Sequence, residues 1–312
     1  MKGIYTARGN IGRLLSLLLF IVANVQALNA DDRAIVIVIV KSSENAYFNQ
    51  TIESLINHAD DHAHFKVLNS SNLDSTSDVL ENADVIITLG ADSASNISSR
   101  SPDQLFVNTY ITLEQAAQFQ DRNQQNIAVL LNQPLERYLA FSHYLLNLKT
   151  LGTIIRSSPA LNSRQLKILK NLNLKLNQYQ LGDTNKNLLA TVRQLTKNNE
   201  ALLMLPEQSI YNHDTLKGIL LTTYRSRIPV ISYSPGHVKS GALAAIYSSP
   251  TDIGRHLANL INQHHEGTLN TNNKTVYAEY YSIVTNQRVA RSLGLNLPGE
   301  EKLRQLIDEA TR

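Results

Sequence analysis

The sharpest cluster of chemically capable side chains lies between residues 58 and 64. His58 and His62 are four residues apart, which on a helix places two imidazoles on one face, within reach of one divalent ion. Asp60, Asp61 and His64 could complete the ligand set. The alternative is a polar helix end that leads into a strand. We favour the helix end and predict no metal site, because α/β folds bind ligands at the opposite rim.

The motifs of common enzyme classes are absent from the sequence. It contains no Gly-x-Ser-x-Gly, no phosphate-binding Gly-x-x-x-x-Gly-Lys-[Ser/Thr] and no His-Glu-x-x-His. The chain has no cysteine, which excludes thiol catalysis, thiolate metal sites, disulfides and a lipidated cysteine anchor. We predict that the protein is not an enzyme and uses no cofactor. An exported hydrolase or metal-binding protein is the alternative.

Loops that follow the predicted strands carry better candidates for ligand binding. In the first half of the chain, Ser43 and Asn45 follow one strand, and Gly90, Ala91 and Ser93 follow another. These loops open helices, whose first backbone N–H groups lack partners and favour an anionic group such as a carboxylate. An ordinary helix cap or turn is the alternative for any one of these residues.

The second half of the chain offers a matching set. Ser158, Glu207, Tyr233 and Ser234 follow its predicted strands. Ligands in doubly wound folds bind at the carboxyl ends of the strands, so two such rims facing each other would form a cleft. We predict that both sets line this cleft and supply hydroxyl groups, one acid and one aromatic side chain.

Short apolar runs and helical patterns alternate along the chain and predict the scaffold. Residues 34–40 are apolar at every position, which is typical of a strand buried on both faces. The pattern predicts further strands at 65–68, 84–89, 105–110, 126–131, 151–156, 174–179, 201–205, 229–233 and 241–247. Helical patterns lie between them. The predicted fold class is therefore α/β, with two doubly wound parallel-sheet lobes.

The last part of the chain completes these lobes. A helix begins after Ser249, with Pro250 at its first position, and ends at His264 and His265, where imidazole suits the negative pole of the helix dipole. A polar loop, a strand at 276–284 and a helix at 300–310 follow, too few for a third domain. The chain must therefore cross between lobes more than once. We expect one lobe at 34–131 plus 249–275, the other at 132–248 plus 276–298, and a C-terminal helix at 299–312.

The N-terminus has the layout of a cleavable secretory signal peptide. Lys2, Arg8 and Arg13 precede an apolar run from 14 to 25, and small residues lead up to Ala27. The run is too short to cross a bilayer, which takes about 20 residues as a helix. We predict a signal peptide at 1–27, cleavage after Ala27 and a periplasmic location. An uncleaved membrane anchor is the alternative.

Net charge does not indicate a nucleic acid or lipid partner. The chain has 29 basic and 26 acidic residues, and the three basic residues of segment 1–27 account for the whole excess. The mature chain is therefore formally neutral. We predict no binding to nucleic acid, and membrane contact only through a partner protein.

The second half of the chain also resembles a known family. Residues 201–263 are similar to ABC-transporter substrate-binding proteins, the family that includes the tryptophan- and tyrosine-binding members. The matching pattern is Ile228-Pro229-Val230, the run 238–244 and Ile253-Gly254-Arg255, and the tail at 276–295 resembles the family's ending. The resemblance extends over the mature chain and is more specific in its second half.

This resemblance implies a periplasmic binding fold of the first type, a venus-flytrap architecture of two lobes joined by three hinge crossovers. It implies a small solute, often an aromatic amino acid, that is enclosed by hinge motion without metal or catalysis. The implied partner is an inner-membrane ABC permease. A sensory module that reports to a membrane receptor or histidine kinase is the alternative.

Three cleft positions depart from the family pattern. Pro206-Glu207 stands where the family commonly has Thr-Asp, Gly90-Ala91 where it usually has Gly-Thr, and 248–251 lacks its tyrosine. We expect the solute to be an amino acid or a related carboxylate. The first-lobe set would hold one end, Glu207 and Tyr233 the other, with the neighbouring serines as neutral donors.

Overall fold

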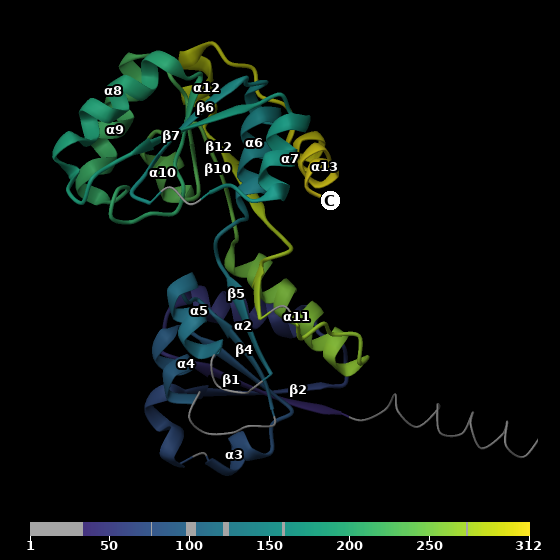
Figure 1. Ribbon diagram of the computed structural model, residues 1–312. Coiled ribbons are helices and arrows are strands. Elements are labelled where there is room, and N and C mark those ends of the chain that lie inside the picture. Colours follow the sequence, from purple (N-terminus) through teal and green to yellow (C-terminus); the bar gives the residue numbers. More distant parts are fainter. Residues whose placement is uncertain (1–33, 76, 98–103, 121–124, 158–159, 273) are drawn as a thin grey trace, which may run out of the picture.

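The computed structural model describes residues 34–75, 77–97, 104–120, 125–157, 160–272 and 274–312 (Figure 1). The predicted signal peptide with its cleavage site after Ala27, and the candidate residue Ser158, lie outside the described residues. None of the helices within these ranges combines the length and the apolar character needed to cross a membrane.

The first lobe is built on six parallel strands in the order β11-β5-β4-β3-β1-β2. These are β1 (Ile35–Lys41), β2 (Ala63–Asn69), β3 (Val85–Leu89), β4 (Leu105–Thr109), β5 (Asn126–Leu130) and β11 (Thr275–Tyr277). The helices are α2 (Ala46–His58), α3 (Ser77–Glu81), α4 (Ala91–Ile97), α5 (Leu113–Gln120) and α11 (Pro250–His265), with a 3-10 turn at Ser70–Ser75. The centre of β1 is fully buried, because apolar clusters cover both faces of the sheet.

The second lobe repeats this plan with strand order β12-β10-β9-β8-β6-β7, in which only β12 is antiparallel to its neighbour. The strands are β6 (Thr150–Ile155), β7 (Lys175–Gln180), β8 (Ala201–Leu203), β9 (Val230–Ser232), β10 (Ala244–Tyr247) and β12 (Ser282–Thr285). The helices are α6 (Leu135–Leu146), α7 (Ser163–Asn171), α8 (Leu188–Asn198), α9 (His213–Arg225), α10 (Pro235–Ser240), α12 (Gln287–Leu293) and α13 (Glu300–Thr311), with a 3-10 turn at Asn185–Asn187. The predicted fold class is confirmed.

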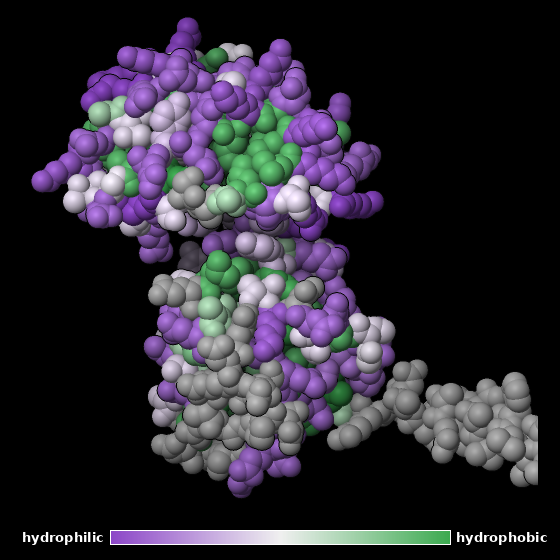
Figure 2. All heavy atoms as spheres, viewed as in Figure 1, coloured by the Kyte–Doolittle hydropathy of each residue, from purple (hydrophilic) through white to green (hydrophobic). Residues whose placement is uncertain are grey.

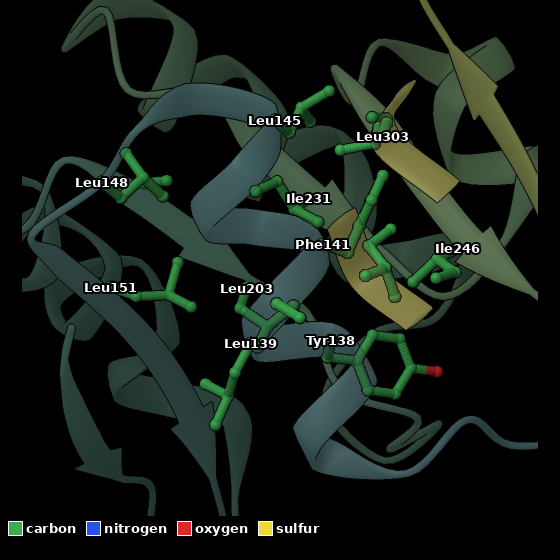
Figure 3. Close-up of a cluster of buried hydrophobic side chains, with 14 of the residues drawn as sticks. Tyr138, Leu139, Phe141, Leu145, Leu148, Leu151, Leu203, Ile231, Ile246 and Leu303 are labelled. Atoms are coloured by element: carbon green, nitrogen blue, oxygen red, sulfur yellow. The ribbon is translucent and has the colours of Figure 1, made fainter. Parts of the chain in front are cut away.

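Helix α6 forms the centre of the main core of the second lobe. Its Tyr138, Leu139 and Phe141 are buried in one cluster with Ile246 of β10 and Leu303 of α13 (Figure 3). The C-terminal helix α13 therefore packs on α6 as part of this lobe.

The lobes are joined at a narrow waist, which the chain crosses three times (Figures 1 and 2). The crossings follow β5, β10 and β11, at 131–134, 248–249 and 278–281. Gln133 is 3% exposed and donates to Ser248 Oγ at 2.5 Å. Arg137 Nη1 donates both to Gln133 Oε1 and, at 3.0 Å, to the carbonyl oxygen of Ala278. One short hydrogen-bond chain thus links all three crossings.

The third crossing corrects one prediction. The sequence predicts a single strand at 276–284 in the second lobe, but residues 275–277 pair with β5 in the first sheet and 282–285 pair with β10 in the second. Apolar residues continue through the crossing because Ala278 is buried in the core of the first lobe and Tyr281 in the core of the second. Periodicity alone therefore cannot show where the chain changes sheets.

Helices α2 and α11 pack closely side by side in the first lobe. A side chain at Gly254 would meet the carbonyl oxygen of Thr51 at 2.4 Å and Cβ of Ser54 at 2.6 Å. The hydroxyl of Ser54 donates to the carbonyl oxygen of Thr251 at 2.9 Å. Both helices begin at the edge of the lobe that faces the waist, so this contact fixes the position of two helix starts near the second lobe.

Candidate functional site

The carboxyl ends of β1, β3 and β4 form the first-lobe rim, which faces the second lobe (Figure 1). Ser43 is exposed in the turn after β1. Asn45 caps α2, because its side chain accepts from the backbone N–H of Phe48 at 2.9 Å. The predicted polar loop is therefore at the rim, and only Ser43 of these two has a side chain free of a capping role.

The turn after β3 is shaped by Gly90, whose φ is +101°. A Cβ here would lie 2.3 Å from Ser42 Oγ and 3.4 Å from Phe48. Ala91 follows as the half-buried first residue of α4. Ser93 is fully buried and donates its hydroxyl to the carbonyl oxygen of Gly90 at 2.9 Å. In this arrangement Ser93 holds the turn and has no surface to offer a ligand.

Tyr110, just after β4, was not among the predicted residues and belongs to this rim. Its backbone is left-handed, with φ +57°, and its ring packs edge-on against Phe48 at 4.9 Å between centroids. Its hydroxyl lies 2.6 Å from Thr51 Oγ1. Burial raises the pKa of Tyr110, so the phenol stays neutral. An aromatic residue at the end of a predicted strand was the signal that could have identified it.

On the second-lobe rim, Glu207 lies against Arg156, which follows β6. The Nε of Arg156 is 3.9 Å from Glu207 Oε1, and the Glu207 side chain is 28% exposed. Arg156 also donates to Ser209 Oγ at 2.9 Å and to Asn185 Oδ1 at 2.7 Å. The arginine therefore ties three loops together and partly balances the one acid of the predicted set.

Tyr233 and Ser234 follow β9 on the same rim. Tyr233 is half-buried, and its burial raises the pKa of the phenol. Ser234 caps α10 by accepting from the N–H of Gly236 at 3.2 Å. The ring of Tyr233 meets the His237 ring edge-on, with centroids 5.0 Å apart.

One pair near this rim has the residue types of a nucleophile and its base. Ser232 Oγ and His237 Nδ1 are 2.6 Å apart. Ser232 is fully buried, however, so its hydroxyl has no access to a substrate. The described rims offer a ligand hydrogen-bonding groups, the carboxylate of Glu207 and aromatic rings.

The histidine cluster lies far from both rims. His62 directly precedes β2, and its carbonyl oxygen accepts from the N–H of Ile35, the first residue of β1. His62 stacks on His265 with ring centroids 3.6 Å apart. Within the described residues, no group of three or more histidines and carboxylates is placed to hold a metal ion. The cluster lies at the edge of the sheet where β1 and β2 begin, opposite the first-lobe rim, as predicted from the sequence.

Known proteins show what this chain is similar to. A family model described as ABC transporter substrate binding protein matches residues 79–306. No curated protein sequence matches the chain.

Solved structures of similar proteins align with this chain at low sequence identity. A ligand-free, open substrate-binding protein with adhesive properties from Clostridium difficile has 14% identity and a TM-score of 0.61, over 86% of this chain and 97% of its own. A conserved domain protein from Vibrio cholerae has 16% identity and a TM-score of 0.48, over 88% and 98%. An ABC domain in complex with L-Trp from Streptococcus pneumonia has 16% identity and a TM-score of 0.48, over 86% and 98%.

Proposed function

The chain belongs to the family of ABC transporter substrate-binding proteins, and on this premise we propose that it captures a small solute between its lobes in the periplasm. It then delivers the solute to an inner-membrane ABC permease. The observation that carries the proposal is the pair of facing rims on two lobes joined by three crossings. Hinge closure over such rims removes a ligand from water and strengthens each hydrogen bond to it.

We further propose that the solute is an amino acid or a related carboxylate. The first-lobe rim supports one end, because α2 opens there and the exposed Ser43 lies in the turn that precedes this helix. Gly90 and Ala91 form the neighbouring turn, and Ala91, which is half-buried, is the first residue of α4, so a second helix opens at the same rim.

The second-lobe rim supports the other end of the solute. Glu207 offers a carboxylate that is still 28% exposed beside Arg156, and an ammonium group would complete its neutralisation. Tyr233 offers an aromatic face and a neutral phenol. Ser158 and Ser234 complete the set as proposed neutral donors, Ser234 through the groups that its capping role leaves free.

A thermal-shift screen tests this function. Purified protein is heated with amino acids, short carboxylates, purines and divalent metals as separate probes. A probe at about 100 times its dissociation constant adds about 2.7 kcal/mol, which raises Tm by a few degrees. Glu207→Gln should weaken an amino-acid response, whereas Glu301→Gln, an exposed glutamate on α13, should not.

Small-angle scattering then tests the capture mechanism. Binding of the stabilising probe should reduce the radius of gyration, because the lobes close on it. A screen with no response from any organic solute would contradict the solute-binding proposal. A response to metal ions alone would redirect attention to His58, His62 and His64.

A further inference from the structure

A polar pocket of about 550 Å³ lies beside the crossings, away from the strand-end rims. Its walls come from α6, α11, α13 and the third crossing, and hence from both lobes. None of the rim residues described above lines it. Its chemistry comes from four arginines and three carboxylates: Arg137, Arg255, Arg304, Arg312, Asp252, Glu279 and Asp308.

Arg137 is the unusual member of this group. It has no ion pair within the described residues, and its Nε is buried without a hydrogen-bond partner. Its two hydrogen bonds go to the neutral oxygens of Gln133 and Ala278. Arg137 is half-buried, and burial lowers the pKa of its guanidinium, although Tyr281, Asp308 and Glu279 nearby raise it. A buried charge normally has a counter-charge, because desolvation is unfavourable without one.

Arg255 faces the same pocket from the other lobe. Its guanidinium lies over the ring of Tyr280, 4.0 Å from the centroid. Its N–H groups have no hydrogen-bond or ion-pair partner among the described residues. Stacking leaves the edge of a guanidinium free, and that edge matches carboxylate and phosphate oxygens.

The carboxylates of the pocket already have donors. Asp252 Oδ2 accepts from the hydroxyls of Ser249 and Ser282, each at 2.6 Å. Asp308 accepts from the Tyr281 hydroxyl at 2.7 Å. Asp252 and Asp308 therefore already accept hydrogen bonds from protein hydroxyls, whereas Arg137 and Arg255 still have N–H groups without an acceptor in the described part of the chain.

We propose that this pocket binds a small oxyanion, such as phosphate, sulfate or a carboxylate, between Arg137 and Arg255. The anion forms the direct ion pair that Arg137 lacks among the described residues. Because Arg137 is on α6 of the second lobe and Arg255 on α11 of the first, the anion bridges the lobes beside their hinge.

Isothermal titration of the purified protein tests the site. Inorganic phosphate, sulfate and succinate are titrated separately at constant ionic strength in chloride, and the comparison shows which oxyanion fits best. Putrescine serves as a cationic probe. At least one oxyanion should bind in preference to putrescine. No binding by any of the three anions, or tighter binding of putrescine, would overturn the proposal.

Variants locate the anion. Arg255→Gln removes a charge-assisted donor from an exposed position, so Kd should rise at least about tenfold. Arg225→Gln, an exposed arginine at the end of α9, should leave Kd unchanged. Arg137→Gln should weaken binding similarly, but Arg255→Gln decides the test because Arg137 also holds the hinge. Equal weakening in the Arg225 and Arg255 variants would contradict a specific pocket.

The pocket and the rims are tested independently. Glu207→Gln should leave binding of the oxyanion unchanged, and Arg255→Gln should leave the thermal response to a rim-bound solute unchanged. Loss of oxyanion binding in Glu207→Gln would place the anion between the rims and overturn the pocket assignment.

Discussion

Gly90 shows how a single residue shapes the first-lobe rim. Its φ of +101° and the 2.3 Å approach of Ser42 Oγ both oppose a side chain. We expect Gly90→Ala to lower the free energy of unfolding by about 1–3 kcal/mol, because the backbone conformation becomes strained. Urea unfolding measures this change. Gly182→Ala is the matched control, since a Cβ there meets nothing within 4 Å; equal losses in both variants would contradict the argument.

His237 predicts a dependence of stability on pH. Burial lowers its pKa, and its ring is enclosed by Ser232 Oγ and the ring of Tyr233. His237 therefore binds a proton more readily in the unfolded state than in the folded state. The stability that neutral His237 contributes is fully present above about pH 6.5 and is lost as pH falls through the lowered pKa of the folded state. We expect the free energy of unfolding to fall between about pH 7.5 and pH 5.5.

Urea titrations at both pH values isolate the His237 contribution. His237→Gln should reduce the pH-dependent loss, because the titrating group is gone. His213→Gln is the matched control, since His213 is fully exposed. The idea fails if the His237 variant keeps the pH dependence of the unmodified protein.

The packing of helices α2 and α11 requires their backbones to approach closely at Gly254. A Cβ at Gly254 would lie 2.4 Å from a backbone oxygen, which cannot move without moving α2. We expect Gly254→Ala to lower the free energy of unfolding by about 1–3 kcal/mol through overpacking. The measurement is denaturant unfolding with equal protein concentrations.

A second helical glycine provides the control for this packing argument. At Gly218 of α9 a new Cβ meets only the flexible Leu189 side chain, at 3.2 Å. Gly218→Ala should be neutral or stabilising by about 0.5–1 kcal/mol, because alanine favours helix more than glycine does. If Gly254→Ala and Gly218→Ala were destabilised equally, the loss would come from placing alanine in a helix and not from the contact between α2 and α11.

Across the two lobes, Gln133 joins the first crossing to the second through Ser248 and contacts Arg137. We expect Gln133→Leu to broaden the distribution of lobe separations, because it removes both hydrogen bonds. The chain has no cysteine, so Glu81→Cys and Lys197→Cys introduce two unique spin labels, one on each lobe. Pulsed electron resonance then measures the separation directly.

Asn132→Ala gives the control for the hinge, because Asn132 is the exposed neighbour of Gln133. Its distance distribution should match that of the labelled parent. Superimposable distributions for Gln133→Leu and the parent would show that the hydrogen-bond chain does not restrain the lobes.

Much of the scaffold could be predicted from local pattern. The run of apolar residues at 34–40 predicts a strand buried on both faces, and β1 occupies 35–41. Asn162, Ser249 and their neighbours form capping boxes at helix starts. Buried strands and helix caps each depend on the types of a few consecutive residues, so both can be predicted from the sequence without knowledge of the fold. The alternation of strands and helices then implies parallel sheets with short connections.

The candidate site was predicted less fully than the scaffold. The polar loops lie at the rims as expected, yet Ser93 is turned inward to hold Gly90, and Ser234 caps a helix. Tyr110 was missed, and the contacts of Arg156 were not predicted, because they depend on Thr51 and Asn185, partners distant in sequence. A residue type indicates what a side chain can do, but neighbours determine where it points.

The amino-acid order alone was thus enough for the α/β class, the two-lobe plan and the family. The fold class and the two-lobe plan follow from short-range periodicity, because strand and helix patterns depend on near neighbours, whereas the family followed from a resemblance in sequence motifs. Three features required the folded chain: the change of sheet between β11 and β12, the hydrogen-bond chain through Gln133 and Arg137, and the pocket beside it. These depend on residues more than a hundred positions apart, such as Gln133 and Ser248, which only meet when both lobes have formed.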